Sequence, residues 1–298
     1  MKMFTIYTPV YNSAGTFKRV YDSLNNQTFK DFEWIIINDG SVDASSEVIR
    51  KLILNSSLDI TFIDLKENIG FNKSFNMAVN KAKGKFFLIS HSDDEITKDA
   101  LQIFYDKWEK LDKKNKELLQ GIKCNCDDQF GNLIGDPFPE DEWISDIFEL
   151  LYIRKIKGEK WGFIKTEIIK KYLFPEDQKF TSEGVIWHRI FYKYPALFIN
   201  KSLRIYYVNE NPQSLSKVTE KNKIYAYGKR MLPLDFINYY FPKVNYNLIL
   251  IISIFVNFWS YSFISRIKII DSLKDIISFK MKLLSVFFII PGYFKSKI

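Results

Sequence analysis

The segment NIGFNKSFNMAVNKAKGKFFLISHSDDE, residues 68–95, combines a predicted helix, a predicted strand and a polar cluster in that order. Residues 72–83 have helical spacing, and the helix is expected to end before Gly84. The run KFFLI at residues 85–89 predicts a buried strand, and HSDDE (residues 91–95) follows it after Ser90. A polar cluster at the carboxyl end of a strand lies where open α/β sheets bind ligands.

Two further polar clusters follow earlier strands in the same way. TPVYN (residues 8–12) ends a strand predicted over residues 4–10, and NDGSVD (residues 38–43) follows a strand predicted over residues 33–37. This repetition of strand and helix predicts a mostly parallel sheet flanked by helices, which is an α/β fold. The other predicted elements of this half are a helix over 13–26 with Ser13 as N-cap, a helix over 45–54 and a strand over 60–65.

The pattern changes after a helix predicted over residues 98–111. The polar run at 112–116 opens a mixed region, in which we expect a long strand over 196–208. Loops are expected at 131–140 and 175–182, and helices beyond residue 216.

Composition excludes several classes of protein. The chain has 298 residues, 47% of them hydrophobic, which is typical of a globular protein and not of a disordered tail. Its two cysteines, Cys124 and Cys126, cannot build a disulfide framework, and no Cys/His set has structural-zinc spacing. The N-terminus has no secretory signal pattern, so we expect a cytoplasmic protein.

The net charge of +8 belongs to the C-terminal part. Residues 217–298 carry 13 Lys/Arg against 4 Asp/Glu, whereas residues 1–216 carry 30 against 31. The same part contains LILIISIFVNFWSYSFIS, residues 248–265, which has no charge. Basic, aromatic and apolar residues together favour a membrane surface, and the absence of a basic-aromatic binding motif argues against nucleic acid. An amphipathic helix at the inner face of the membrane, a single span, and a helical core or homodimer face all remain open for this stretch.

The segments resemble the inverting family-2 glycosyltransferases of the GT-A fold over roughly residues 3–216. The resemblance rests on TPVYN, QTFKDFEWIIINDGSVD (27–43), the run from 68 to 94, and FTSEGVIWHRI (180–190). It implies a Rossmann-like nucleotide-sugar-binding half over 1–111, an acceptor-binding and catalytic half over 112–216, and a helical extension over 217–298. It also implies a hexosyl or N-acetylhexosaminyl donor on a nucleotide diphosphate, with a UDP-sugar favoured.

In this family the position of Asp39 contacts the nucleotide, and a carboxylate there can accept a bond from a pyrimidine N–H or a ribose hydroxyl. From the residues alone, Asp39 and Gly40 could equally form a turn, Tyr11 could stack on the base or belong to the core, and Lys73 could bind phosphate or lie in solvent. The resemblance places the donor nucleotide on Pro9, Tyr11, Asn12, Asp39, Asn68, Gly70, Lys73, Asn76 and Asp93.

Asp93 and Asp94 are adjacent carboxylates whose repulsion a divalent cation would relieve while it neutralises the leaving diphosphate. The resemblance implies that Asp94 ligates Mn²⁺ or Mg²⁺ and that Asp93 contacts the ribose or the metal. Many members have a third acid where this chain has His91. That histidine could be a ligand, a phosphate donor or a packed side chain.

An inverting transferase needs a carboxylate that deprotonates the acceptor hydroxyl. The family usually takes it from an acidic pair that opens a helix, and the matching dipeptide here is Glu183-Gly184, without the second acid. Glu183 is therefore the predicted base, with Asp177 and then Glu176 as alternatives. Trp187 could be a sugar platform or a core residue. His188 and Arg189 are weaker candidates for contact with acceptor or diphosphate.

Processive polymerases of this family carry a Gln-x-x-Arg-Trp signature and several membrane spans, which this sequence lacks. The resemblance therefore implies a single sugar addition to a saccharide or lipid-linked acceptor, as in bacterial surface polysaccharide synthesis. A catalytically silent protein that binds nucleotide sugar or scaffolds a glycan assembly complex is the alternative, because His91 and Gly184 both depart from the family pattern.

Overall fold

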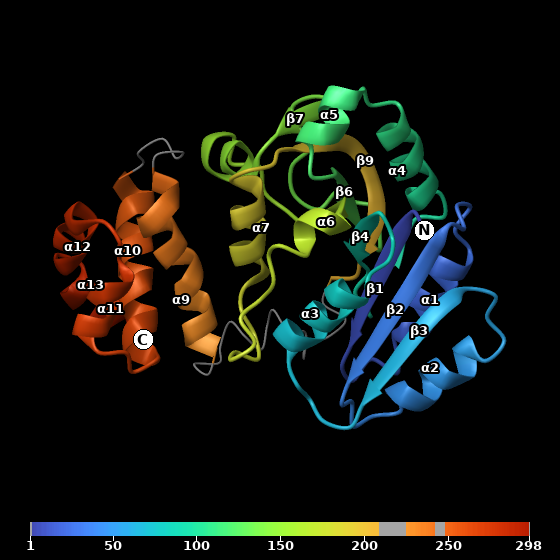
Figure 1. Cartoon of the computed structure of the whole chain (residues 1–298), viewed down its shortest axis with the longest axis horizontal. Helices are drawn as coiled ribbons and strands as arrows, with labels where there is room; N and C mark the ends of the chain where they lie inside the picture. The colour runs from blue at the N-terminus through green and yellow to red at the C-terminus, as the bar shows by residue number, and fades with distance from the viewer. Residues whose placement is uncertain (1, 209–224, 242–247, 298) are drawn as a thin grey trace.

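The computed structural model describes residues 2–208, 225–241 and 248–297. An α/β domain is followed by a group of helices, which lies beside it at the left of Figure 1. The first half of the domain is the predicted repeat of strand and helix. Its strands are parallel in the order β3-β2-β1-β4: β1 Phe4–Val10, β2 Phe32–Asp39, β3 Asp59–Leu65 and β4 Phe86–Ile89.

Helices α1 Phe17–Asn25, α2 Ser45–Ile53 and α3 Phe71–Lys81 connect these strands. The prediction that Ser13 caps the first helix is wrong, because α1 begins four residues later and Thr16 occupies its N-cap position. The Ser13 hydroxyl instead lies 2.8 Å from that of Ser92. Ser13 therefore joins the ends of β1 and β4.

The second half continues the sheet with mixed strand directions. β8 Lys160–Lys165 pairs antiparallel with β4, and β6 Ile122–Asp128 lies between β8 and β9 Ala196–Tyr206. Only the first half of the sheet is parallel throughout, as predicted. Of the strands in this half, only β9 was predicted. β6 and β8 were not predicted, and neither were the antiparallel strands β5 Glu95–Ile96 and β7 Glu142–Ser145, which both pair with β9. β5 and β7 are too short to give a recognisable alternation.

The remaining elements of this domain connect the strands. They are α4 Ala100–Glu109, α5 Lys113–Leu118, the π-helical turn η1 Glu149–Ile153, α6 Thr166–Ile169 and α7 Glu183–Phe191. Residues 112–116, the polar run that opens the mixed region, lie largely in α5, which the Asp112 side chain caps through the Asn115 N–H.

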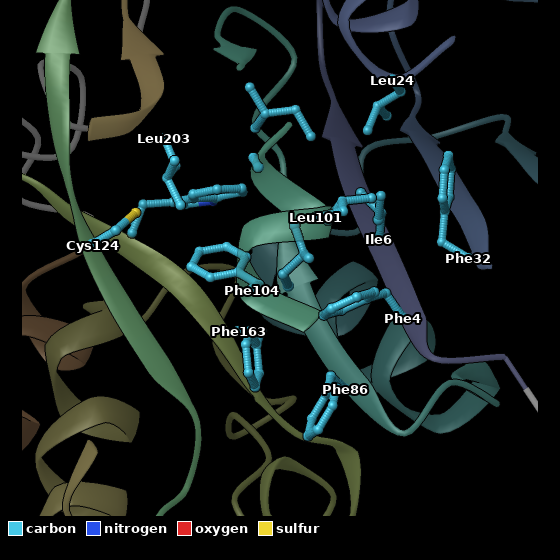
Figure 2. Close-up of a cluster of buried hydrophobic side chains, with 14 of the residues drawn as sticks. Phe4, Ile6, Leu24, Phe32, Phe86, Leu101, Phe104, Cys124, Phe163 and Leu203 are labelled. Atoms are coloured by element: carbon cyan, nitrogen blue, oxygen red, sulfur yellow. The ribbon is translucent and has the colours of Figure 1, made fainter. Parts of the chain in front are cut away.

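Alternate residues of the strands fill two cores, one on each face of the sheet. Phe4 and Ile6 of β1 pack with α1 and α4, and Figure 2 shows Phe86, Phe104 and Phe163 in the same cluster. Tyr7 of β1 points to the opposite face, where α3, α6 and α7 cover the sheet. Successive side chains of a strand point to opposite faces of the sheet, so each strand contributes side chains to both cores.

The C-terminal helices have a core of their own. Phe255, Phe258 and Trp259 of α10 are fully buried in it. Among the described residues, no helix is long and apolar enough to cross a membrane. Of the three alternatives for residues 248–265, the helical core therefore accounts for one face of α10. The elements of this part are α9 Ala226–Asp235, η3 Phe236–Tyr240, α10 Leu248–Ile264, α11 Ile269–Asp275, α12 Phe279–Val286 and α13 Ile289–Lys295.

Helix α9 packs against α7 and so connects the C-terminal helices with the α/β domain (Figure 1). Arg189 of α7 makes a two-pronged ion pair with Asp235 of α9, with N–O distances of 2.6 and 3.1 Å. Gly228 brings the backbone of α9 against Phe180, since an added Cβ would lie 2.3 Å from the Phe180 carbonyl oxygen. The two parts therefore pack closely. The predicted boundary at residue 216 lies outside the described residues.

Candidate active site

Asp39 ends β2 at the carboxyl edge of the sheet, as predicted. Its side chain is buried, and its carboxylate oxygens accept the backbone N–H groups of Ile69 at 2.7 Å and Gly70 at 3.0 Å. Burial raises the pKa of Asp39, and these two hydrogen bonds oppose the shift. Each carboxylate oxygen keeps a second lone pair. Asp39 thus holds the loop before α3 and can still accept a donor from a ligand at either oxygen.

Two glycines let this loop approach β2. Gly40 has φ +65°, and an added Cβ would lie 2.3 Å from the Glu67 carbonyl carbon. Gly70 has φ +91°, and its Cβ would lie 2.5 Å from the Lys179 carbonyl oxygen. Both the left-handed backbone and the lack of space require glycine. Gly70 consequently shapes the predicted nucleotide pocket through its backbone.

The end of β1 presents Tyr11 to solvent, with half of the residue exposed. It is therefore not a core residue and is free to contact a base. Asn12 has φ +52°, and its side-chain oxygen accepts the Val42 N–H at 2.9 Å. Pro9 is partly buried in β1 opposite Ile37 of β2. These residues lie at the same sheet edge as Asp39.

Asn68 donates to the Asp39 carbonyl at 3.3 Å and so belongs to the same group. Lys73 is exposed on α3. Asn76 is buried, and its amide bonds both backbone groups of Phe174, the N–H at 2.9 Å and the carbonyl at 2.8 Å. In this arrangement Asn76 anchors the loop before α7 and directs no polar group outward. Asn72, which sequence reasoning missed, anchors the same loop through the Thr181 N–H at 2.8 Å.

Asp94 follows β4, where its carboxylate faces a residue that sequence reasoning missed. Arg204 of β9 donates from Nε to Asp94 Oδ2 at 3.0 Å and forms a second bond to it from Nη2. Each of the two side chains is only 4% exposed. The other oxygen, Oδ1, accepts the Tyr207 N–H at 3.3 Å. The β5–β9 pairing creates this contact, because Ile96 lies opposite Arg204.

Asp93 and His91 lie beside this ion pair. Burial and then the neighbouring Asp94 raise the pKa of Asp93. Burial, followed by the charge of Arg204, lowers the pKa of His91 to about 4, so its imidazole is neutral at pH 7. No three His, Cys, Asp or Glu side chains converge on one point within the part of the chain that the structure describes. The protein oxygens that fit a divalent cation are those of Asp93 and Oδ1 of Asp94, since Oδ2 is engaged by Arg204.

A cavity of about 140 Å³ lies between this edge and α7. Glu183, Trp187 and Phe191 line it from α7, at the i, i+4 and i+8 positions of one helix face. Gly184 belongs to the next face, since an added Cβ there would lie 3.5 Å from Leu232 of α9. The other lining residues are Phe87, Leu88, Ile89, His91, Lys123, Ile147, Leu150, Glu159, Lys160, Trp161, Gly162, Ile164, Phe198 and Arg204.

Of the Glu183-Gly184 pair, Glu183 is therefore the residue that faces the cavity. Burial and then the charge of Glu159 raise the pKa of Glu183 to about 7, against an opposing hydrogen bond from Trp187. A general base works best when its pKa is close to the working pH. Glu176 and Asp177 are exposed in the preceding loop and do not line the cavity.

The two basic residues of α7 have structural partners. His188 is buried, with Nδ1 2.6 Å from the Gly184 carbonyl and Nε2 2.8 Å from the Tyr152 hydroxyl. Burial lowers its pKa to about 4. Arg189 is engaged by Asp235, as described above. The geometry therefore assigns both residues to packing between α7 and the C-terminal helices.

Comparison with known proteins adds a family to this geometry. A sequence model of glycosyl transferase family 2 matches residues 5–123. The glycosyltransferase GlyA of Streptococcus pneumoniae is 28% identical over 231 residues, which are 73% of this chain and 32% of that protein. A Campylobacter jejuni GalNAc(5)-diNAcBac-PP-undecaprenol beta-1,3-glucosyltransferase is 26% identical over 211 residues, 69% of this chain and 65% of that protein.

The match spans about a third of GlyA and 16% of a Staphylococcus epidermidis teichoic acid poly(glycerol phosphate) polymerase. Among solved structures, S. aureus TarS residues 1–349 in complex with UDP-GlcNAc superposes with a TM-score of 0.64 at 17% identity. The superposition covers 99% of this chain and 89% of that one. At this identity the likeness shows the fold, which is GT-A. Residues 5–123 therefore match the glycosyl transferase family 2 model, and the described part of the chain has the GT-A fold.

Proposed function

We propose that this protein transfers a single sugar from a nucleotide-diphosphate sugar to a hydroxyl group of an acceptor, with inversion at the anomeric carbon. The observation that carries the proposal is the position of Glu183. Its carboxylate lines the same cavity as His91 and Arg204, which belong to the predicted diphosphate edge. A carboxylate with a pKa of about 7 in this place suits the deprotonation of an acceptor.

In this mechanism Glu183 accepts the proton of the acceptor hydroxyl, and the acceptor oxygen forms a bond to the anomeric carbon. The bond between that carbon and the diphosphate oxygen breaks on the opposite face, and the electron pair leaves with the nucleoside diphosphate. Inversion follows from this in-line geometry. Arg204 is placed to stabilise the charge that develops on the leaving group, and Asp94 orients its guanidinium.

Mn²⁺ or Mg²⁺ would be held by Asp93 and by Oδ1 of Asp94. Such a hard cation prefers oxygen ligands and, when bound, would supply charge neutralisation for the departing diphosphate. The two carboxylates differ in their protein partners. Asp94 also neutralises Arg204, whereas Asp93 has no such partner among the side chains that the structure describes.

Donor and acceptor classes follow from the relatives as proposals. Structures of TarS are described with UDP and with UDP-GlcNAc, which supports a UDP-sugar donor here. The Campylobacter relative acts on an undecaprenol-linked saccharide by its name, which supports a saccharide or lipid-linked acceptor in a bacterial surface glycan.

A hydrolysis screen tests the proposal. Purified protein is incubated with Mn²⁺ and a panel of UDP-, GDP- and dTDP-sugars, and free nucleotide is measured. We expect one donor to be hydrolysed, and the rate to fall in Glu183→Gln while nucleotide affinity is retained. The alternative is a silent protein that binds nucleotide with metal and releases none from any donor; it is favoured by the departures at His91 and Gly184.

We propose further that the C-terminal helices lie on an anionic membrane surface, so that the protein is peripheral to the inner face of the cell membrane. Helix α12 exposes Phe279 and Leu283, its C-cap residue Phe287 continues this spacing of four residues, and α13 exposes Ile290 and Phe294. Each of these five side chains is more than half exposed. We call them the apolar ridge.

Lysines accompany this ridge, among them the exposed Lys280, Lys295 and Lys297. Exposed apolar side chains beside basic residues complement a bilayer, because the rings enter the headgroup region and the ammonium groups remain near lipid phosphate. A membrane surface also fits a lipid-linked acceptor. A second copy of the chain is the competing occupant of the ridge.

A further inference from the structure

Among the cations that line the cavity, Lys123 of β6 is the one for which the described residues provide neither an ion pair nor a hydrogen bond. Arg204 pairs with Asp94 and Glu159, and Lys160 donates to the Asn125 side chain at 2.8 Å. The Lys123 ammonium contacts the ring of Trp187, whose centroid lies 5.2 Å away. An ammonium over an aromatic face is attracted, but the ring carries no net charge to neutralise it.

The alternation of side chains along β6 directs the Lys123 side chain toward the cavity. Ile122 and Cys124 point into the core on one face of the sheet, so Lys123 points to the other face, under α7. Its neighbours in the sheet are Gly162 of β8, which has no side chain, and Phe198 of β9. Lys123 lines the cavity, and Phe198 places apolar atoms beside it.

Such a position disfavours a charged lysine. Burial lowers the pKa of Lys123 to about 8, so the group is still mostly protonated at pH 7. A partly buried charge without a counter-ion is costly, and the cost is removed when a ligand brings the opposite charge. The two acids of the cavity have other partners, since Glu159 pairs with Arg204 and Glu183 accepts a bond from Trp187.

We propose that Lys123 forms an anion subsite, which binds a carboxylate or a phosphate ester carried by a sugar in the cavity beside Glu183. This inference rests on the proposed function and names its substrate class as an acidic sugar. Trp187 connects the two groups, because its ring faces Lys123 and its indole N–H bonds Glu183. The acidic sugar is either the transferred sugar of the donor or the residue of the acceptor that receives it.

The test measures binding of defined probes to the whole chain by calorimetry or ligand-observed NMR. The donor arm compares UDP-glucuronate with UDP-glucose. The acceptor arm, with UDP present, compares methyl β-glucuronide and glucose 6-phosphate with methyl β-glucoside. We expect an acidic probe to bind about tenfold more tightly than its neutral counterpart in one arm, and that arm identifies the source of the acid.

The variants assign the preference to one side chain. Lys123→Met should abolish it, Lys123→Arg should retain it, and Lys193→Met, which removes an exposed lysine after α7, should leave it unchanged. A native melting temperature in Lys123→Met shows that the loss is not unfolding, and Lys123→Gln replaces that variant if it is unstable. Equal binding of acidic and neutral probes, or a preference that survives in Lys123→Met, overturns the inference.

Different results would refute the anion subsite and the transferase function. If UDP binds and a donor is hydrolysed while no acidic probe is preferred, the anion subsite is refuted and the transferase remains. If no donor of the panel is bound or hydrolysed, the proposed function is refuted, and the acidic and neutral glycosides still report on Lys123 directly.

Discussion

At the scale of single residues, the candidate site depends on charges that burial has made unfavourable. Glu183 has its pKa raised to about 7, and Lys123 has its pKa lowered to about 8. Asp94 and Arg204 stabilise each other within the fold. Perturbed groups that surround one cavity are typical of functional sites, because catalysis uses the same desolvation that costs stability.

Glu183→Gln should lose activity and gain stability. The rate should fall by roughly 10²–10⁴-fold with nucleotide affinity retained, since the proposed general base is removed. In the wild type, the rate should decline as the pH falls below about 7 and the base becomes protonated. A pH–rate profile with purified enzyme measures this limb. Asp177→Asn serves as the comparison, and a loss of rate there instead would move the base to the preceding loop.

The raised pKa of Glu183 fixes the sign of the stability change expected in Glu183→Gln. The folded pKa of Glu183 lies above its unfolded value of about 4.5, so ionisation destabilises the folded state above pH 7 and has no effect below about pH 4. Glu183→Gln should therefore melt at a higher temperature than the wild type at pH 8. The difference should vanish near pH 4. A lower melting temperature at pH 8 would contradict the buried, uncompensated carboxylate.

Asp93→Asn and Asp94→Asn should separate the two acids. Asp94→Asn leaves the buried Arg204 without its partner and should cost about 3–5 kcal/mol of stability. Asp93→Asn removes a charge that repels Asp94 and should keep the melting temperature while cutting turnover by about 10²-fold. Thermal melts and Mn²⁺ titrations distinguish the effects. Equal melting temperatures in the two variants would show that the Asp94–Arg204 pair contributes little.

At the scale of elements, the loop between β3 and α3 is held in place by β2. Asp39 accepts two of its backbone N–H groups, and Lys179 from the loop before α7 donates to its Asn68 carbonyl at 3.2 Å. Asn72 and Asn76 tie α3 to the same later loop. The predicted donor pocket is thus shaped by hydrogen bonds between segments about a hundred residues apart.

Gly70→Ala should disturb this arrangement more than Gly131→Ala. Both glycines have positive φ, but an added Cβ at Gly131 meets no atom within 4 Å, whereas at Gly70 it would lie 2.5 Å from a carbonyl oxygen. Backbone strain alone should cost about 1–2 kcal/mol in Gly131→Ala. Gly70→Ala should lose more, and UDP affinity should fall with it. Calorimetry with UDP measures the affinity, and retained affinity would separate this loop from the donor pocket.

At the scale of the whole molecule, the C-terminal helices have two faces with different roles. The inner face packs on α7 through the Arg189–Asp235 pair, and it surrounds Phe148 and His188. The outer face carries the apolar ridge. Deleting the helices would expose that inner face, so membrane binding is better tested in the full chain.

The full chain should bind vesicles that contain phosphatidylglycerol and bind pure phosphatidylcholine weakly. High salt should weaken the binding, since each nearby Lys or Arg contributes about 1 kcal/mol through screened attraction. Phe287→Ser should reduce affinity by about tenfold because one ring no longer enters the lipid. Leu54→Ser, which removes an exposed leucine after α2, is the matched control. Vesicle sedimentation measures all of these.

A dimer would give a different result. Analytical ultracentrifugation would then show twice the mass without lipid, Phe287→Ser would restore the monomer, and vesicles of either composition would remain unbound. That outcome would assign the ridge to a subunit interface.

The sequence by itself determined the features whose causes are local. Apolar, β-branched runs predicted β1 to β4, and helical spacing predicted the helices between them. The polar residues that end those strands share one edge because parallel strands end together. Glu183 was found through the family resemblance, which implies an acid at the start of a helix. The family resemblance added roles to these residues. It did not supply their partners.

Only the tertiary structure decided which side chains meet. Asp94 and Arg204 are 110 residues apart, and Lys123 meets Trp187 across the space between β6 and α7. Both contacts depend on pairings of β9 with β5 and β6, whose register is fixed by packing of the whole sheet and not by neighbouring residues. In the same way, packing buried one face of α10 and left the ridge on α12 and α13 exposed, although all three segments are apolar in the sequence.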